Sequence, residues 1–382
     1  MTSRHPDEGS RRLHVLHVSA SGSGDIAVVA LGYVRDQVER GWNVSVACSS
    51  RGSLGYDARD AGARAHWWQA EREPGRRVVG EYLRLSRIIQ DADPDVVHLH
   101  GSKAGLVGRL VLRNRIPTVF QPHAWSYLGA RGRTGAASRR WERFATRWTA
   151  VTVCASAAER VAGGRLGIDG RTMVVRNGVE LPTFRPQGNR DRAAARKLLG
   201  LADAPTAVCI GELTAQQGQA DLLEAWADVL AEAPEARLVL VGDGPERARL
   251  ERLAEALPGL SLVGARSDAR VWLAAANVVV LPARWDGMAL VAVEAMASAR
   301  SVVATSVSGV AETVPEDAGA VVAPRDPQAL ASAIGHRLLD PAAADDEGWA
   351  GRAHVEAHHD AASSAQELAR VYLRLVGEHR AR

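Results

Sequence analysis

The chain has 382 residues, of which 46% are hydrophobic and 24% are charged, and its formal net charge is +3. This length exceeds one ordinary hydrophobic core, so we expect two domains, and the small net charge gives no reason to expect nucleic-acid binding. The absence of an apolar run of about 18 residues and of a signal-peptide core predicts a cytoplasmic protein, either free or peripheral to the inner face of the membrane.

Three cysteines, Cys48, Cys154 and Cys209, are far apart, and each lies in an apolar strand-like run. We expect buried free thiols rather than disulfides, which suits a reducing compartment.

The first half of the chain alternates strand and helix patterns. Residues 13–18 predict a strand, residues 19–24 a Ser/Gly loop, residues 26–39 a helix and residues 43–48 a second strand, which together form a right-handed βαβ unit. The same pattern continues with helices near 78–90, 103–113 and 138–149, and with strands at 95–99, 117–120 and 150–154.

Two prolines, a glycine and charged residues at 181–190 indicate a linker, after which a second βαβ series begins. Its strands are predicted near 206–211, 237–241, 261–263, 277–281 and 301–304, and residues 361–376 predict a last amphipathic helix. The fold class is therefore α/β, with two doubly wound, Rossmann-like parallel-sheet domains. Such domains in tandem hold a ligand in the cleft at the carboxyl ends of their strands.

Residues 282–296, Pro-Ala-Arg-Trp-Asp-Gly-Met-Ala-Leu-Val-Ala-Val-Glu-Ala-Met, are the most informative stretch. A strand breaks at Pro282, and a helix is predicted to start near Ala289 with Glu294 about one turn inside it. Unpaired amides at a helix N-terminus bind phosphate, and a carboxylate one turn on can accept hydrogen bonds from sugar hydroxyls. A phosphate and a ribose together make half of a nucleotide.

This stretch resembles the signature of the family-four retaining glycosyltransferases, which have the GT-B fold, and the likeness extends from about residue 13 to about residue 335. The family usually reads Glu-Gly-Phe-Gly-Leu-Val and then Leu-Glu-Ala-Met-Ala, so Asp286 stands for the first Glu and Glu294 for the second. The resemblance implies that Asp286 contacts the donor sugar and that Glu294 binds the ribose. A helix N-cap is the alternative for Asp286, and a solvated helix carboxylate is the alternative for Glu294.

The resemblance also assigns the domains. It implies a disordered N-terminus at 1–12, an acceptor-side domain at 13–183, a nucleotide-sugar-binding domain at 184–360, and a C-terminal helix at 361–382 that packs back on the first domain. Donor contacts are expected from Gly24, Arg266, Gly287, Met288, Ala289, Leu290 and Val291, where the amides of the last three would hold the β-phosphate.

The family's donor-phosphate segment departs from its usual form here. Where the family reads Gly-Arg-Leu and, further on, Lys-Gly, this chain has Glu212 and Gln217 in the Arg and Lys places. At contact, a charge pair is worth roughly 4 kcal/mol at an effective dielectric near 20, so a reversed sign is a large change. Three interpretations stay open: substitute cations (Arg266, Arg284 or Arg300), a site that no longer catalyses, or a different donor or coupling chemistry.

His123 follows a predicted strand in Phe-Gln-Pro-His-Ala-Trp, where the family often has Thr-Pro-His-Gly. The resemblance implies that its imidazole faces the reacting sugar and bonds a hydroxyl or steadies positive charge. The alternative is a loop histidine packed on Trp125.

His98-Leu-His100-Gly-Ser-Lys103 resembles a His-Ser-Ser-Lys-Ala-Gly segment of capsule and exopolysaccharide members of the family. The likeness implies acceptor contacts from His100 and Lys103, and the glycine loop suggests another from Gly22. His98 and His100 share a strand face and could bind a metal, but no third ligand is evident, so we expect neither a metal nor a cofactor.

Residues 139–148 place Trp141, Phe144 and Trp148 on one helical face among arginines. Such a helix either packs on the domain core or lies on an anionic membrane.

We therefore predict a retaining glycosyltransferase that moves a sugar from a nucleotide-diphosphate sugar, its co-substrate, to a polysaccharide, lipid-linked or small natural-product acceptor. The alternatives are a degenerate, non-catalytic binding or regulatory protein on the same scaffold, and an enzyme with unusual donor chemistry. No pattern in the chain specifies the nucleotide base, the sugar, the acceptor or the oligomeric state.

Overall fold

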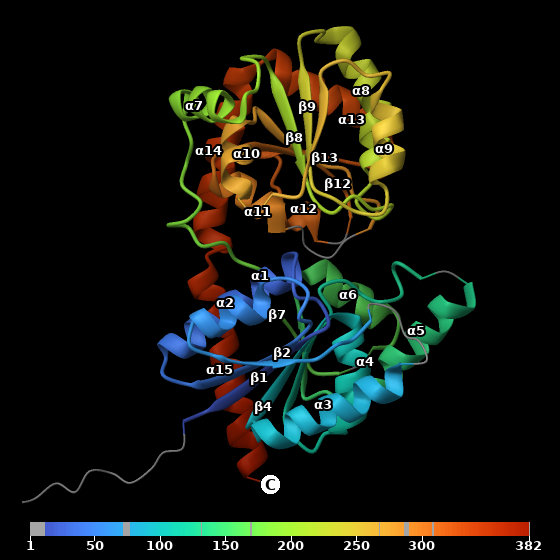
Figure 1. Cartoon of the computed structure of the whole chain (residues 1–382), viewed down its shortest axis with the longest axis vertical. Coiled ribbons are helices and arrows are strands. Elements are labelled where there is room, and N and C mark those ends of the chain that lie inside the picture. Colours follow the sequence, from blue (N-terminus) through green and yellow to red (C-terminus); the bar gives the residue numbers. More distant parts are fainter. Residues whose placement is uncertain are drawn as a thin grey trace, which may run out of the picture.

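The computed structural model describes residues 12–71, 77–130, 132–168, 170–266, 268–285, 290–307 and 309–381. Within these ranges the chain folds into two α/β domains that are stacked along the long axis of the molecule (Figure 1). Each domain contains one parallel sheet with helices on both faces, so the predicted fold class is confirmed.

The first domain is built on a sheet with the strand order β3-β2-β1-β4-β5-β6-β7. Its elements are β1 (His14–Ser19), α1 (Asp25–Glu39), β2 (Asn43–Cys48), α2 (Leu54–Asp60), β3 (Arg64–Trp67), α3 (Val78–Ala92), β4 (Val96–His100), α4 (Gly101–Leu112), β5 (Thr118–Gln121), α5 (Gly132–Ala145), the 3₁₀ turn η1 (Thr146–Trp148), β6 (Val151–Cys154), α6 (Ala157–Arg165) and β7 (Thr172–Val174). The strand order reverses between β1 and β4, which opens a ligand crevice at their carboxyl ends.

The second domain is built on a sheet with the strand order β10-β9-β8-β11-β12-β13. Its elements are α7 (Asn189–Leu199), β8 (Thr206–Ile210), α8 (Gln219–Glu232), β9 (Arg237–Val241), α9 (Arg247–Ala254), β10 (Leu260–Gly264), α10 (Ala269–Ala275), β11 (Val278–Leu281), α11 (Leu290–Ala297), β12 (Ser301–Thr305), α12 (Val310–Thr313), β13 (Gly319–Val322), α13 (Pro327–Leu339) and α14 (Pro341–His358). The order reverses between β8 and β11, so the loops that end these two strands bound the second crevice.

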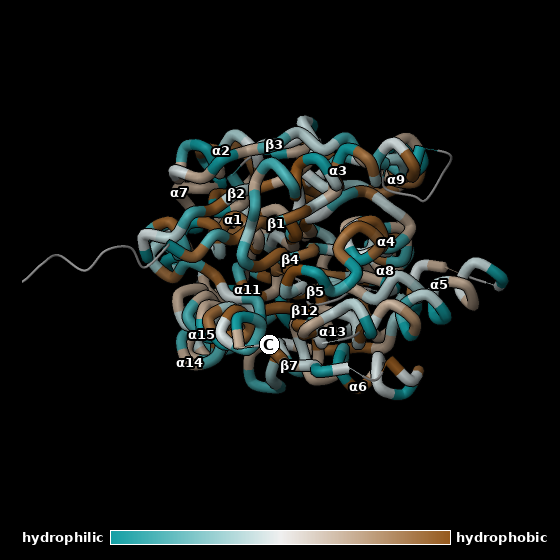
Figure 2. The backbone as a smooth tube through the Cα atoms, turned by 90° about the horizontal axis from the view of Figure 1, so that it is seen from below, coloured by the Kyte–Doolittle hydropathy of each residue, from teal (hydrophilic) through white to brown (hydrophobic). Residues whose placement is uncertain are grey.

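The strands of both sheets are apolar because helices cover both of their faces. In the first domain, α3 and α4 cover one face, while α1, α2 and the last helix, α15 (Ala361–Arg380), cover the other. In the second domain, α8 and α13 cover one face, and α10, α11 and α14 cover the other. Figure 2 shows the apolar strands β1, β4 and β5, coloured brown, enclosed by helices whose outer faces are hydrophilic and coloured teal.

The chain crosses between the domains twice, and the two crossings lie side by side. The Val179 amide donates to the carbonyl of His359 at 2.8 Å, and the Ala361 amide donates back to Val179 at 3.1 Å. Gly178 permits this approach, because a Cβ there would lie 2.5 Å from the Ala361 Cα. The Asn-Gly string at 177–178 therefore serves the scaffold, and α15 returns to the first domain, where Tyr372 is fully buried.

Several elements were not predicted from the sequence. Strands β3, β7 and β13 have only three or four residues each and lie at the edges of the sheets, where most of their residues are only partly buried, so they lack the fully buried apolar run of the inner strands. The linker is shorter than expected, because α7 already begins at Asn189. The three cysteines are free and buried, and none of the described helices combines the length and apolar character that a membrane crossing needs.

Candidate active site

The start of α11 reaches across to the first domain. Leu290 is 2% exposed and belongs to an apolar cluster with Val15, Val29 and other first-domain residues. Four predicted donor contacts immediately before it, Asp286, Gly287, Met288 and Ala289, lie outside the described residues, so their roles stay predictions. The N-terminus of α11 is nevertheless located at the contact between the domains, where the sequence predicts an anion site.

Glu294 lies one turn into α11 and is partly buried. Burial and, to a smaller extent, the negative charge of Asp25 together raise its pKa from 4.5 to about 8. Because Asp25 is the first residue of α1, two carboxylates approach each other across the gap between the domains. Asp25 escaped the sequence analysis, because nothing in the sequence indicates which first-domain loop faces α11.

The loop between β8 and α8 carries Glu212 and Gln217, the two residues that the resemblance places where Arg and Lys are usual. Glu212 is exposed and Gln217 is partly exposed, and the Gln219 amide secures the loop by donating to the Glu212 carbonyl at 3.1 Å. The loop packs tightly on the exit of β11, where a Cβ on Gly218 would lie 2.0 Å from the Pro282 carbonyl oxygen. Both side chains are thus at the carboxyl edge of the second sheet, as predicted, while their contact with a donor stays a prediction.

The structure separates the three candidate substitute cations. Arg300 immediately precedes β12, so it lies at the opposite edge of the sheet; it is 1% exposed and donates to the carbonyls of Leu273 and Ala274. Its proposed role as a substitute cation is therefore wrong. Arg284 lies near the predicted site but forms a bidentate pair with Asp221, at 2.8 and 2.5 Å, so most of its charge is already balanced.

Arg266 follows β10 at the carboxyl edge and is exposed. Of the three arginines, it is the one that retains both the predicted location and solvent access. Its contact with a donor phosphate stays a prediction.

His123 follows β5 and has a left-handed backbone, with φ at 59°. Its Nε2 lies 3.1 Å from Nδ1 of His100, and burial lowers its pKa to about 3, so the imidazole is neutral. Trp125 stacks with Tyr127 and packs edge-on against Phe120. The alternative of a histidine packed on Trp125 is therefore not what the structure shows.

A third histidine joins the pair on β4. His17 of β1 is in register with His98, and nitrogens of His17, His98 and His100 lie within 4.8 Å of one another. The expectation that no third metal-ligating residue exists is thus wrong, because strand pairing brought together residues far apart in sequence. His17 Nδ1 and His100 Nε2 share a hydrogen bond of 2.9 Å, and His98 Nδ1 lies 2.6 Å from the Tyr372 phenol oxygen, whereas His98 Nε2 has no hydrogen-bond partner among the described residues.

Two predicted acceptor contacts lie inside the first domain. His100 is 1% exposed, and both of its ring nitrogens have protein partners. The Lys103 ammonium is buried on the Glu81 carboxylate of α3, at 3.0 Å. The structure does not support an acceptor contact by either side chain, because neither reaches the surface of the crevice.

Two glycines of the loop after β1 have different structural roles. A Cβ on Gly22 would lie 2.0 Å from the carbonyl oxygen of Arg51, so this glycine is required by packing of the chain on itself. Gly24 precedes α1 with φ at 75°, and no atom lies within 4 Å of the place of its Cβ. Gly24 therefore leaves open space at the helix start, which is compatible with its predicted donor contact.

Glu312 of α12 links the two domains. Its carboxylate accepts hydrogen bonds from the amides of Ala157 and Ala158, at 2.9 and 2.5 Å, and these are the first amides of α6 in the first domain. A negative charge at a helix N-terminus is stabilised by the unpaired amides and the helix dipole. No pattern in the sequence indicated this contact across the domains.

Helix α5 stands at the periphery in both views (Figures 1 and 2). Trp141, Phe144 and Trp148 pack on one another, and Phe144 keeps 42% of its surface exposed. The neighbouring Arg147 lies over the Phe144 ring at 4.0 Å. The aromatic face is thus partly covered by its own arginines and partly open to solvent.

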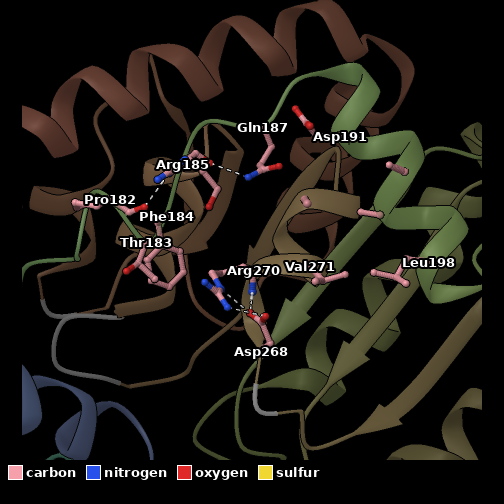
Figure 3. Close-up of a pocket in the computed structure, with 14 residues that line it drawn as sticks. Pro182, Thr183, Phe184, Arg185, Gln187, Asp191, Leu198, Asp268, Arg270 and Val271 are labelled. Atoms are coloured by element: carbon pink, nitrogen blue, oxygen red, sulfur yellow. Dashed lines mark hydrogen bonds and ion pairs between the residues drawn. The ribbon is translucent and has the colours of Figure 1, made fainter. Parts of the chain in front are cut away.

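A hollow of about 600 Å³ lies in the second domain, between the linker, α7 and α10 (Figure 3). Its polar groups largely pair with one another: Arg270 bonds Asp268 at 2.8 and 2.9 Å, and the Gln187 amide donates to the Arg185 carbonyl. None of the predicted site residues lines it, so we do not place the donor there.

Comparison with known proteins gives the same assignment for both halves of the chain. Residues 26–182 match the family described as Glycosyltransferase Family 4, and residues 204–340 match the family described as Glycosyl transferases group 1. The chain is 30% identical over 261 residues to the lipopolysaccharide core biosynthesis mannosyltransferase LpcC of Rhizobium leguminosarum bv. viciae, which covers 65% of this chain and 72% of that protein. It is 35% identical over 192 residues to a GDP-mannose-dependent phosphatidylinositol monomannoside mannosyltransferase of Corynebacterium glutamicum, but that match covers only 47% of this chain and 50% of that protein.

Solved structures agree on the architecture. Sucrose-phosphate synthase from Thermosynechococcus elongatus has a TM-score of 0.82 at 24% identity, covering 96% of this chain and 100% of that chain. Anabaena HepE in complex with UDP-glucose has a TM-score of 0.80 at 21% identity, covering 94% and 99%. At these identities the likeness establishes the fold alone. Together with the sequence matches to both halves, it shows that the chain belongs to the family 4, group 1 glycosyltransferases and has the GT-B fold.

Proposed function

We propose that the protein is a retaining glycosyltransferase that transfers a sugar from a nucleotide-diphosphate sugar to an acceptor held by the first domain. The observation that carries the proposal is Glu294. It is a partly buried carboxylate one turn into α11, and it lies opposite Asp25 at the start of α1, in the gap between the two domains. Burial and repulsion by Asp25 both disfavour the ionised form of this carboxylate. A residue with so perturbed a pKa is a candidate for a functional site, and hydrogen bonding to ribose hydroxyls is a function that it can perform.

The remaining roles follow from position. His123, neutral and at the crevice of the first domain, would contact the donor sugar together with Asp286. The amides of Ala289, Leu290 and Val291 would hold the β-phosphate. With Glu212 and Gln217 in place of cations, these amides and the α11 dipole would carry most of the charge that develops as the diphosphate leaves.

The choice of donor and acceptor is guided by the relatives. Several are named as GDP-mannose-dependent mannosyltransferases acting on phosphatidylinositol mannosides. We therefore propose a GDP- or UDP-linked hexose as donor and a glycan or lipid-linked acceptor. Contact with an anionic membrane surface through Phe144 and the arginines of α5 would place the enzyme beside a lipid acceptor.

Thermal shift with UDP, GDP and ADP compounds is the first test. A ligand present at 100 times its dissociation constant stabilises the native protein by about 2.7 kcal/mol, so a true donor nucleotide raises the melting temperature measurably. The Glu294→Ala variant should lose most of this shift, whereas Glu224→Ala, which removes an exposed glutamate of α8, should keep it. Retention is then read from the anomeric proton of the first-formed product by NMR.

A non-catalytic binding protein is the second candidate, and Glu212 is the observation that favours it. An exposed carboxylate in the place of the family's arginine repels a diphosphate. This candidate predicts no turnover with any nucleotide sugar even where a nucleotide binds. Restoring the cation with Glu212→Arg would then raise nucleotide affinity without creating activity.

A further inference from the structure

A line of hydrogen-bonded side chains runs from α1 to His123. Gln37 Oε1 lies 3.0 Å from His17 Nε2, His17 Nδ1 lies 2.9 Å from His100 Nε2, and His100 Nδ1 lies 3.1 Å from His123 Nε2. Gln37, His17 and His100 are at most 2% exposed. Burial lowers the pKa of all three imidazoles, so each ring is neutral and carries a single proton.

Neutral imidazoles in a row can order their protons in only two ways, because each ring donates from one nitrogen and accepts at the other. The group at the buried end selects the order. Burial raises the pKa of the neighbouring Tyr372 phenol of α15 well above its usual value, and a hydrogen bond with the Gln37 side chain opposes part of this rise. The structure places the oxygen of the Gln37 amide toward His17, since Oε1 is the atom that lies 3.0 Å from His17 Nε2.

From this end the order is determined ring by ring. His17 donates from Nε2 to the Gln37 oxygen, so its Nδ1 accepts from His100 Nε2–H. His100 Nδ1 then accepts from His123 Nε2–H. Consequently His123 holds its proton on Nε2 and has a lone pair on Nδ1, which has no protein partner among the described residues.

We propose that Gln37, His17 and His100 are positioning residues that hold His123 in the Nε2–H tautomer, so that its Nδ1 accepts a hydrogen bond from a hydroxyl of the sugar being transferred. The second half of this inference rests on the proposed function, whereas the tautomer does not. The left-handed backbone at His123 is consistent with such a role. The hydrogen bond to His100 fixes the direction of the His123 side chain even when no ligand is bound in the cleft.

The tautomer is tested by NMR on ligand-free protein with ¹⁵N-labelled histidine. Long-range ¹H–¹⁵N correlations distinguish the two tautomers of each ring, and the His123→Asn spectrum identifies the His123 signals. We expect a single Nε2–H form of His123 near neutral pH. In His17→Phe, which removes the acceptor for His100, we expect a mixture of both His123 tautomers. His66→Phe, a strand histidine of the same sheet outside the line, is the matched control and should leave His123 unchanged.

Two further variants keep the test decisive if His17→Phe does not fold. Gln37→Glu retains an oxygen facing His17 and should preserve the Nε2–H form, while Gln37→Leu removes it and should mix the tautomers. An Nδ1–H form in the wild type, or an unchanged tautomer in both His17→Phe and Gln37→Leu, overturns the proposal. Stoichiometric zinc in the purified protein would also overturn it, because the same nitrogens would then ligate metal.

Activity tests the consequence separately. With a donor established, His17→Phe and Gln37→Leu should lower kcat about 10-fold with little change in KM for the nucleotide sugar, and Gln37→Glu should restore most of it. An unchanged kcat in variants with mixed tautomers contradicts the positioning role. If no donor is turned over by the wild type, the proposed function fails, and the NMR result still decides the proton order.

Discussion

Replacing Glu294 with glutamine removes a carboxylate whose ionised form is unfavourable where the two domains meet. The pKa of Glu294 rises to about 8, first because of burial and then because of Asp25 across the gap. A group whose pKa is raised by folding stabilises the folded state fully below its unfolded value, near 4.5, and loses that contribution as the pH rises through about 8. Glutamine keeps the shape and lacks the charge, so the variant should escape this loss.

The magnitude follows from the size of the pKa change. A tenfold change in proton affinity corresponds to about 1.4 kcal/mol, so ionising Glu294 in the closed protein costs up to about 5 kcal/mol. Separation of the two domains relieves part of this cost, and we expect about 2 kcal/mol in unfolding experiments.

Denaturant unfolding of wild type and Glu294→Gln at several pH values measures the effect. The two should have nearly equal stability near pH 5, and the variant should be the more stable above about pH 8. Glu224→Gln, in an exposed part of α8, should follow the wild type throughout. A constant difference between Glu294→Gln and wild type across the pH range would refute the reasoning.

Three other variants test the framework of the site. Glu312→Gln removes the charged acceptor that caps α6 across the domains, and we expect a larger radius of gyration in X-ray scattering and a loss of about 1–3 kcal/mol; an unchanged scattering profile would argue against the interdomain contact. Gly178→Ala places a methyl 2.5 Å from the returning chain and should cost roughly 1–3 kcal/mol, whereas Gly32→Ala in open space of α1 should be neutral or stabilising; equal thermal stability of the two would contradict the tight crossing. Lys103→Met leaves the Glu81 carboxylate buried without its partner and should cost about 3–5 kcal/mol, while an acceptor affinity that falls with stability intact would restore the predicted acceptor contact.

The sequence was sufficient for the architecture, because parallel strands buried on both faces read as short apolar runs separated by glycine loops. Strands 206–211 and 237–241 were predicted within a residue of β8 and β9. The short edge strands β3 and β13 were not, because most of their residues are only partly buried and they do not form the fully buried apolar run of an inner strand.

The site was harder to predict, because its contacts join segments far apart in the sequence. The string around Glu294 indicated a ligand carboxylate, but no local signal placed Asp25 opposite it. Likewise, His98 and His100 suggested a pair, and only the register of β1 on β4 brought His17 beside them. Arg300 was misassigned even though the strand predicted at 301–304 already placed it at the amino end of that strand, opposite to the carboxyl edge where a ligand is expected.

The most direct test of the central claim is calorimetric titration of nucleotide diphosphates into wild type and Glu294→Ala. The account predicts that one nucleotide binds the wild type and that Glu294→Ala weakens its binding about tenfold or more, because at least one hydrogen bond to the ribose is lost. Equal affinity in the two proteins, or no binding of any nucleotide to the wild type, would contradict it.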